Sequence, residues 1–165
     1  MPCRAGLFVL ALALLCLDAS ARPAQQSFQG TGQLRTTWRD GDHADLGCLT
    51  DRGRWTSDNS TCGTFEATPD PQTPSVFTLK TDAGYCNVYG AEFTCDAGNE
   101  AQPFGTWPEN WPNGIPGQKV LRWGQYGLMA SSAAGPPSLA DAPEAIHLAS
   151  YNEPGKFVWL TWLGL

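Results

Sequence analysis

Four cysteines lie between Gly47 and Cys95, among short runs of β-branched and aromatic residues that Gly, Pro, Asn and Asp separate. Such runs are typical of short strands that tight turns connect. Disulfides between these runs would restrict the unfolded chain and favour a compact arrangement of the strands. The segment therefore predicts a small β domain stapled by disulfides.

The N-terminus predicts a secretory signal peptide over residues 1–21. A basic start at Met1–Arg4 precedes an apolar run of twelve residues, Gly6–Leu17, and the small residues Ala19–Ala21 provide a cleavage site. The apolar run is shorter than the roughly 20 residues that a membrane-spanning helix requires, and no later run reaches its length. We therefore expect a soluble, secreted, extracellular protein that does not bind or span a membrane.

Cleavage at that position would remove Cys3 and Cys16 and leave four cysteines in the mature chain. These are Cys48, Cys62, Cys86 and Cys95. An even number of cysteines in an exported chain predicts two disulfides, for which three connectivities exist. Zinc binding is the alternative, but the spacing contains neither a CxxC pair nor a histidine at ligand distance along the chain. We predict disulfides, no bound metal and no cofactor.

A predicted hairpin around Gly90–Ala91 decides the connectivity. Gly at the first central position of a two-residue turn suits the type II′ geometry. With that turn Cys86 faces Cys95, and cysteines opposed in a non-hydrogen-bonded pair are close enough to bridge. We therefore predict a Cys86–Cys95 disulfide and, by elimination, a Cys48–Cys62 disulfide. The same register pairs Tyr89 with Glu92, Val88 with Phe93 and Asn87 with Thr94.

The charge of the chain argues against a nucleic-acid partner. The signal segment carries one acidic and one basic residue, so the mature chain keeps the net charge of −6. Its lysines and arginines are scattered, whereas a surface that follows phosphates requires them in clusters. The 18 glycines, 13 prolines and 7 tryptophans are typical of a compact, loop-rich β protein. We expect an all-β fold, a small sandwich or barrel of short antiparallel strands.

We predict a flexible lead-in over residues 22–33, with a short first strand within residues 22–30 as the alternative, and a single β domain over residues 34–165. A helix over residues 137–149 is an alternative for one stretch, but Pro143 in its middle argues against a long helix. The predicted strands cover residues 34–38, 46–50, 53–56, 63–67, 76–80, 85–89, 92–95, 120–123, 127–130, 146–151 and 157–162.

A pattern of cysteines, turn glycines and core aromatic residues runs through residues 47–98. It comprises Leu49, Gly53, Trp55, Cys62, Phe65, Ala67, Phe77-Thr78-Leu79, Gly84, Cys86, Val88, Phe93, Cys95 and Gly98. This pattern resembles the small β domain at the C-terminus of many fungal ribonucleases of the RNase T2 type, and the likeness continues more weakly to residue 162. The resemblance implies the fold of that accessory domain and secretion.

The ribonuclease activity of that family is not implied. In those enzymes the β domain follows a catalytic module with two histidine boxes, of the HGLWP and KHGTC kind. Here it follows the predicted signal peptide almost directly, and the contexts of His43 and His147 match neither box. Acid–base cleavage of RNA needs a positioned proton donor and acceptor with cations nearby. We expect a free-standing domain that is not an enzyme and has no catalytic residues.

Acidic residues near the start of the predicted domain allow two further interpretations. Asp40, Asp42 and Asp45 lie with His43 within six residues, a set that suits calcium, but the Gly and distal Glu of an EF-hand loop are missing. A solvated acidic turn is the favoured interpretation. A pair such as Asp40 and Glu66 would suit a glycosidase, so a small carboxylate-dependent hydrolase is an alternative function.

The segment Pro103–Gly117 contains Trp107 and Trp111, each followed by proline. A loop stiffened by proline would present both indoles to solvent, where their faces stack on sugar rings. The two tryptophans are therefore the candidate glycan-binding residues. The competing interpretation is that both rings cover the core under a long loop.

The sequon Asn59-Ser60-Thr61 predicts an N-glycan on Asn59. Three functional classes follow from the sequence. We favour a non-catalytic, secreted binding module for a cell-wall polysaccharide or a host component. The hydrolase is the second class, and the third is an interaction protein, an effector or an inhibitor, that acts through an exposed apolar patch.

Overall fold

The computed structural model describes residues 27–108, 114–130, 135–150 and 157–165, which form twelve β-strands and one short 3₁₀ helix. The strands are β1 (Gly30–Trp38), β2 (Cys48–Leu49), β3 (Trp55–Thr56), β4 (Phe65–Pro69), β5 (Val76–Thr81), β6 (Gly84–Tyr89), β7 (Glu92–Asp96), β8 (Phe104–Trp107), β9 (Val120–Arg122), β10 (Tyr126–Ala130), β11 (Ile146–Ser150) and β12 (Val158–Gly164), and the helix is η1 (Asn59–Thr61). The predicted all-β fold is confirmed.

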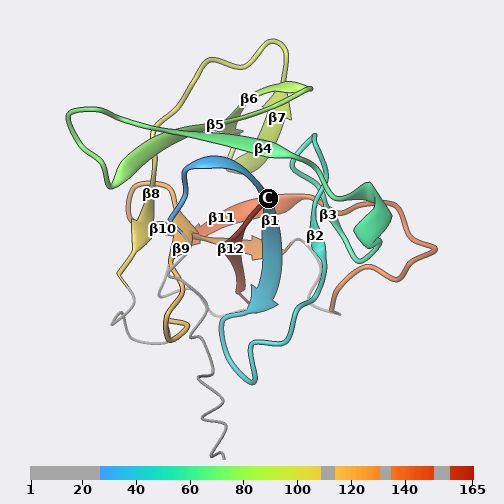
Figure 1. Ribbon diagram of the computed structural model, residues 1–165. Coiled ribbons are helices and arrows are strands. Elements are labelled where there is room, and N and C mark those ends of the chain that lie inside the picture. Colours follow the sequence, from blue (N-terminus) through green and yellow to red (C-terminus); the bar gives the residue numbers. More distant parts are fainter. Residues whose placement is uncertain (1–26, 109–113, 131–134, 151–156) are drawn as a thin grey trace, which may run out of the picture.

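Six of these strands close into an antiparallel barrel, in the order β1, β4, β5, β8, β9 and β12. The last strand returns to the first, and β1 and β12 lie side by side in Figure 1. Their register runs from Gly32 opposite Gly164 to Trp38 opposite Val158. Closure leaves these strands without a long exposed edge. Of the two predicted architectures, the chain forms the barrel.

The remaining strands extend the barrel on two sides. On one side β5 pairs with β6, β6 with β7, β7 with β11 and β11 with β10. On the other side β1 pairs with β2, and β2 pairs with β3. The far side of β3 is also paired, because Trp55 and Glu144 exchange two backbone hydrogen bonds of 2.8 and 2.9 Å.

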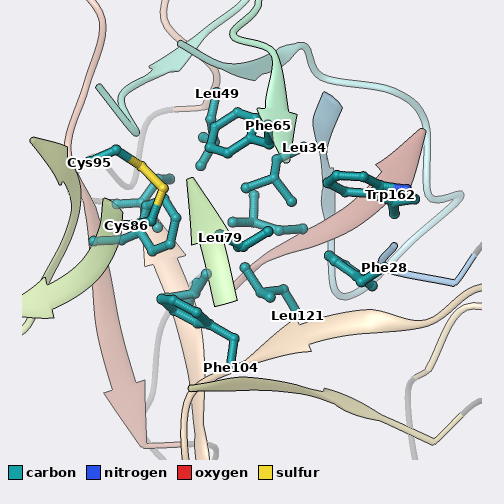
Figure 2. Close-up of a cluster of buried hydrophobic side chains, with 14 of the residues drawn as sticks. Phe28, Leu34, Leu49, Phe65, Leu79, Cys86, Cys95, Phe104, Leu121 and Trp162 are labelled. Atoms are coloured by element: carbon teal, nitrogen blue, oxygen red, sulfur yellow. A yellow bond between two sulfur atoms is a disulfide. The ribbon is translucent and has the colours of Figure 1, made fainter. Parts of the chain in front are cut away.

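The interior follows the two-residue alternation of the strands. Leu34 on β1 and Trp162 on β12 face each other inside the barrel, whereas the next pair, Arg35 and Thr161, faces outward. Figure 2 shows Leu34 and Trp162 in the main core, with the Cys86–Cys95 disulfide at its border. A second, smaller cluster of Ile115, Val120 and Trp159 packs against Trp107.

Both predicted disulfides are present, with Cα–Cα distances of 5.5 Å for Cys48–Cys62 and 3.9 Å for Cys86–Cys95. The predicted register of the β6–β7 hairpin is confirmed at every pair. The backbone N–H of Cys95 donates to the carbonyl of Arg52 at 3.3 Å, as expected for a strand pair in which Cys86 and Cys95 are not bonded through their backbones.

The turn of that hairpin differs from the predicted type II′. Gly90 and Ala91 both have positive φ angles, 58° and 69°, which is the signature of a type I′ turn. Type I′ turns match the right-handed twist of the flanking strands as type II′ turns do. The turn therefore places an L-residue, Ala91, in the left-handed region, where it costs about 1–2 kcal/mol.

The predicted lead-in over residues 22–33 is wrong in its C-terminal part. β1 begins at Gly30, and Phe28 is buried in the core. The start of β1 lacks the side chains that mark a strand, yet its backbone pairs with β4 and β12. Gly32 lets the indole of Trp162 lie on the backbone, since a Cβ there would stand 2.5 Å from the ring. The predicted signal peptide lies outside the described residues.

Two further expectations from the sequence are corrected. The segment Pro103–Gly117, predicted as a loop, contains β8, in which Gly105 pairs with Arg122 on β9. The alternative helix over residues 137–149 is not formed, because β11 begins at Ile146. In the parts of the chain that the structure describes, no helix is long and apolar enough to cross a membrane.

The strain at Ala91 predicts the effect of a substitution. Ala91→Gly removes the left-handed penalty and adds chain entropy to the unfolded state, so we expect it to raise the free energy of unfolding by up to about 1 kcal/mol. Ala97→Gly is the matched control, because Ala97 is exposed in a turn without a positive φ angle, and we expect it to lower stability slightly. Chemical denaturation measures both. Equal destabilisation by the two changes would contradict the strain at Ala91.

Candidate functional site

A cleft of about 310 Å³ lies on the outer face of the β1–β12 pair. Thr37 on β1 and Thr161 on β12 belong to its floor, next to Arg35. One wall comes from the loop between β1 and β2, residues 39–47, and the other from the segment that precedes β9, residues 114–119. The volume falls within the range of small-ligand sites, about 300–1,000 Å³.

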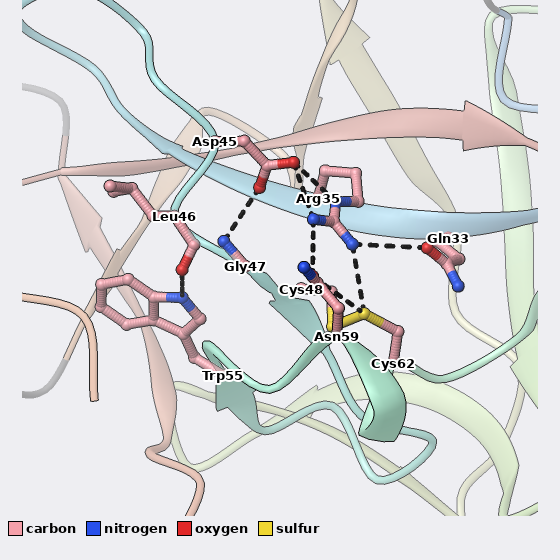
Figure 3. Close-up of polar contacts among 9 residues, drawn as sticks. All are labelled: Gln33, Arg35, Asp45, Leu46, Gly47, Cys48, Trp55, Asn59 and Cys62. Carbon is pink, nitrogen blue, oxygen red and sulfur yellow. Dashed lines mark hydrogen bonds and ion pairs between the residues drawn. A yellow bond between two sulfur atoms is a disulfide. The ribbon is translucent and has the colours of Figure 1, made fainter. Parts of the chain in front are cut away.

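Arg35 is the polar hub beside this cleft (Figure 3). Its Nε and Nη2 donate to Oδ2 of Asp45 at 3.1 and 2.7 Å. Nη2 also donates to Oδ1 of Asn59 at 2.8 Å, and Nη1 donates to Oε1 of Gln33 at 3.4 Å and to Sγ of Cys62 at 3.2 Å. A guanidinium has five N–H donors, and these five contacts use them all. Arg35 therefore holds the scaffold together and has no donor left for a ligand.

The carboxylates of the first wall contact groups within the loop of residues 39–47 and stabilise its conformation. Oδ1 of Asp42 accepts from the N–H of Ala44 at 3.1 Å, and Oδ1 of Asp45 accepts from the N–H of Gly47 at 2.9 Å. Asp40 pairs with its neighbour Arg39 at 2.8 Å. The described residues contain no group of three or more His, Cys, Asp or Glu side chains placed to hold a metal ion.

His43 sits on the same wall in a strained backbone conformation. Its φ angle is 55°, in the left-handed region that His adopts more readily than most residues, at a cost of order 1 kcal/mol or more. Its Nδ1 lies 3.1 Å from the carbonyl oxygen of Trp38. Because a carbonyl only accepts, Nδ1 carries a proton, and Nε2 remains for a second partner.

The second wall is set by a tight turn. The N–H of Gln118 donates to the carbonyl of Ile115 at 3.0 Å, with Pro116 and Gly117 between them. Gly117 has a φ angle of 77°, so the turn has the Pro-Gly pattern of type II. Ile115 is buried in the second cluster and anchors the turn, which brings Gln118 and Lys119 to the cleft.

Trp107 is positioned by a strand and lies outside the cleft lining. It ends β8, faces Val120 across the β8–β9 pair and packs on the second cluster. The guanidinium of Arg122 lies 5.3 Å from its ring centroid, in a cation–π contact. The ring is half-buried against this cluster, and its role as a glycan-binding residue stays a prediction. Trp111 lies outside the described residues.

The predicted glycosylation site is exposed and held by a short helix. Asn59 begins η1, and Oδ1 of Asp58 caps the helix by accepting from the N–H and the hydroxyl of Ser60 at 2.9 and 2.7 Å. These hydrogen bonds lower the pKa of Asp58. The bond from Arg35 uses Oδ1 of Asn59 and leaves Nδ2, the atom that a glycan would modify. Glycosylation of Asn59 stays a prediction.

The carboxylates of the hydrolase alternative belong to different parts of the surface. Glu66 lies on β4 beside Lys80, in a hollow that does not include Asp40. A general acid requires a raised pKa. Among the described residues, the two carboxyl groups with clearly shifted pKa values, Asp58 and Asp141, instead have lowered ones, because each accepts hydrogen bonds from a nearby serine.

A second hollow lies on the outer face of the β6–β7 hairpin. Arg52, Tyr89, Asp96 and Asn99 are among its lining residues. The side chain of Tyr89 is 80% exposed and that of Tyr85, on the same strand face, is 40% exposed. Arg52 keeps 76% of its side chain in solvent beside a weak 3.9 Å ion pair with Asp96. This surface is open and rich in the residue types that dominate protein interfaces.

Sequence reasoning placed His43 and the acidic residues in one loop, and the structure brings His43 and Asp45 to the cleft. Thr37, Thr161 and the wall formed by Gln118 and Lys119 were not predicted from the sequence. The only local signal for that wall is the Pro116–Gly117 dipeptide, which predicts a turn but not what the turn faces.

A family model described as RNase T2-like C-terminal domain matches residues 26–112. The match includes both disulfides, strands β1 to β8 and the first wall of the cleft. The second wall and β12 lie beyond it. Comparisons with the curated proteins and with the solved structures found no match.

The five contacts of Arg35 predict a stability effect. Lysine keeps the charge but cannot reproduce the planar fork of donors, so we expect Arg35→Lys to lower the free energy of unfolding by about 1–3 kcal/mol. Arg52→Lys is the control, because its ion pair is exposed, and we expect a change within about 0.5 kcal/mol. Urea unfolding without reductant measures both. An Arg35→Lys protein as stable as the parent would contradict the role of Arg35 as a hub.

Proposed function

Because the chain belongs to the RNase T2-like C-terminal domain family, we propose that it is an extracellular binding module whose β1–β12 cleft holds a polysaccharide. Two disulfides and membership in a domain family of secreted ribonucleases are consistent with an extracellular location. Export by the predicted signal peptide and the absence of nucleic-acid and membrane partners are parts of the same proposal.

The chemistry of the cleft is the observation that carries the proposal. Thr37 and Thr161 offer hydroxyl groups, and Gln118 offers an amide, all of which pair with the hydroxyl groups of a sugar. Leu163, which is 40% exposed, adds apolar surface to the lining that suits the C–H face of a sugar ring. A few polar groups beside apolar surface are typical of ligand sites.

The proposed role is non-catalytic. Asp45 is committed to Arg35 and to the N–H of Gly47, which leaves it poorly suited to abstract a proton from a ligand. His147 lies on β11 and does not line the cleft with His43. A pair of histidines that shares the acid and base steps of RNA cleavage is thus not supported by their placement.

Protein binding through the β6–β7 hairpin is the second candidate function. Tyr85, Tyr89 and Arg52 form an exposed group on that face, and Tyr and Arg are enriched among residues that dominate binding energy. An effector or inhibitor would use this surface toward a host protein. The two candidates differ in the residues that they require.

Retention on insoluble chitin, β-glucan and cellulose tests the polysaccharide proposal. Thr161→Val removes one hydroxyl from the cleft and keeps the shape of the side chain, so we expect affinity for the retained polymer to fall about three- to tenfold. Thr78→Val is the control, because Thr78 is half-buried on β5 away from the cleft. Loss of retention in Tyr89→Ala but not in Thr161→Val would move the site to the hairpin.

Two further arms complete this experiment. Trp107→Ala and Trp111→Ala examine the aromatic pair, and retention that depends on them but not on Thr161 would contradict the cleft as the site. Absence of retention on every polymer would remove the polysaccharide proposal. An in-gel assay with RNA should show no hydrolysis, and hydrolysis that His43→Ala abolishes would overturn the non-catalytic role.

A further inference from the structure

We propose that the cleft selects an acidic sugar unit, whose carboxylate binds the ammonium group of Lys119. The inference rests on the proposed binding function and adds the chemical class of the ligand. It follows from the charges that line the cleft and from the donors that remain available in it.

The charges of the cleft lining do not cancel. Arg35 and Asp45 neutralise each other through a 2.7 Å ion pair, and the five contacts of Arg35 use all of its donors. Lys119 is the other cation of the lining, and none of the ion pairs among the described residues involves it. One compensated pair and one uncompensated ammonium give the cleft a local positive charge, although the chain carries a net charge of −6.

The backbone around Lys119 is well anchored. Lys119 follows the Pro116–Gly117 turn and directly precedes Val120, whose partner across the β9–β12 pair is Thr161. Val120 is buried in the second cluster. The side chain of Lys119 therefore lines the cleft from a backbone that is fixed next to Thr161, so a ligand would have to order only the side chain.

The remaining polar groups suit the rest of a sugar. Since Nδ1 of His43 donates to the carbonyl oxygen of Trp38, Nε2 is the ring nitrogen that remains for a sugar hydroxyl. The Thr161 hydroxyl donates or accepts as the ligand requires, whereas the Thr37 hydroxyl donates to the carbonyl oxygen of Trp38 at 3.5 Å and offers its oxygen as an acceptor. A carboxylate beside Lys119 and hydroxyls beside these groups describe a uronic acid unit better than a free inorganic anion, which would leave the hydroxyl-binding groups unused.

Binding of an oligogalacturonide and of its methyl ester to the full mature chain tests the inference by calorimetry. The ester keeps the sugar stereochemistry and removes the charge, and a charge-assisted hydrogen bond is typically worth a factor of about ten or more in affinity. We expect the parent protein to prefer the acid over the ester about tenfold. Inorganic sulfate at the same concentration should not displace the oligomer.

Lys119→Gln should lose this preference while it retains the affinity for the ester. Lys80→Gln is the matched control, because it removes the same charge from exposed Lys80 on β5, and the preference should persist. Equal affinity of the parent protein for acid and ester, or displacement by sulfate, would overturn the inference and leave the proposed function standing. Absence of binding to both oligomers and to every neutral polymer would overturn both.

Discussion

The pairing of the first strand with the last is the constraint on which the other features depend. β1 and β12 close the barrel, and their alternation sends Leu34 and Trp162 into the core and Arg35 and Thr161 to the outside. The same register therefore decides the interior of the domain and the floor of the cleft. A shift of one residue would exchange the two faces, so core packing also fixes the groups that a ligand would meet.

Arg35 connects this strand pair to the disulfide region. One guanidinium contacts the acidic loop through Asp45, the 3₁₀ helix through Asn59 and the Cys48–Cys62 disulfide through the sulfur of Cys62. Arg35 has the residue type and position of a ligand-binding cation, but all of its N–H donors already bind groups of the domain itself. In the proposed site the anion therefore binds Lys119, which the Pro116–Gly117 turn positions on the other wall.

Local features of the fold were predictable from the sequence, and long-range ones were not. The β6–β7 register and its disulfide follow from a two-residue turn with cysteines equally far from it. β8 was missed because Pro103 and Gly105 suggest a loop, whereas Gly105 in fact pairs with Val76 on β5 and with Arg122 on β9. The cleft was missed because Thr37 and Thr161 meet only when the two ends of the domain pair, and no local pattern specifies that partner.

The central claim is that ligand binding takes place on the outer face of the β1–β12 pair. Two-dimensional NMR of the isotopically labelled protein, titrated with a soluble acidic oligosaccharide, tests it most directly. The account predicts that the backbone amide signals of Thr37, Thr161 and Gln118 shift together and saturate with one apparent Kd, while those of the β6–β7 hairpin stay in place. Shifts confined to the hairpin around Tyr89, with the cleft signals unchanged, would contradict it.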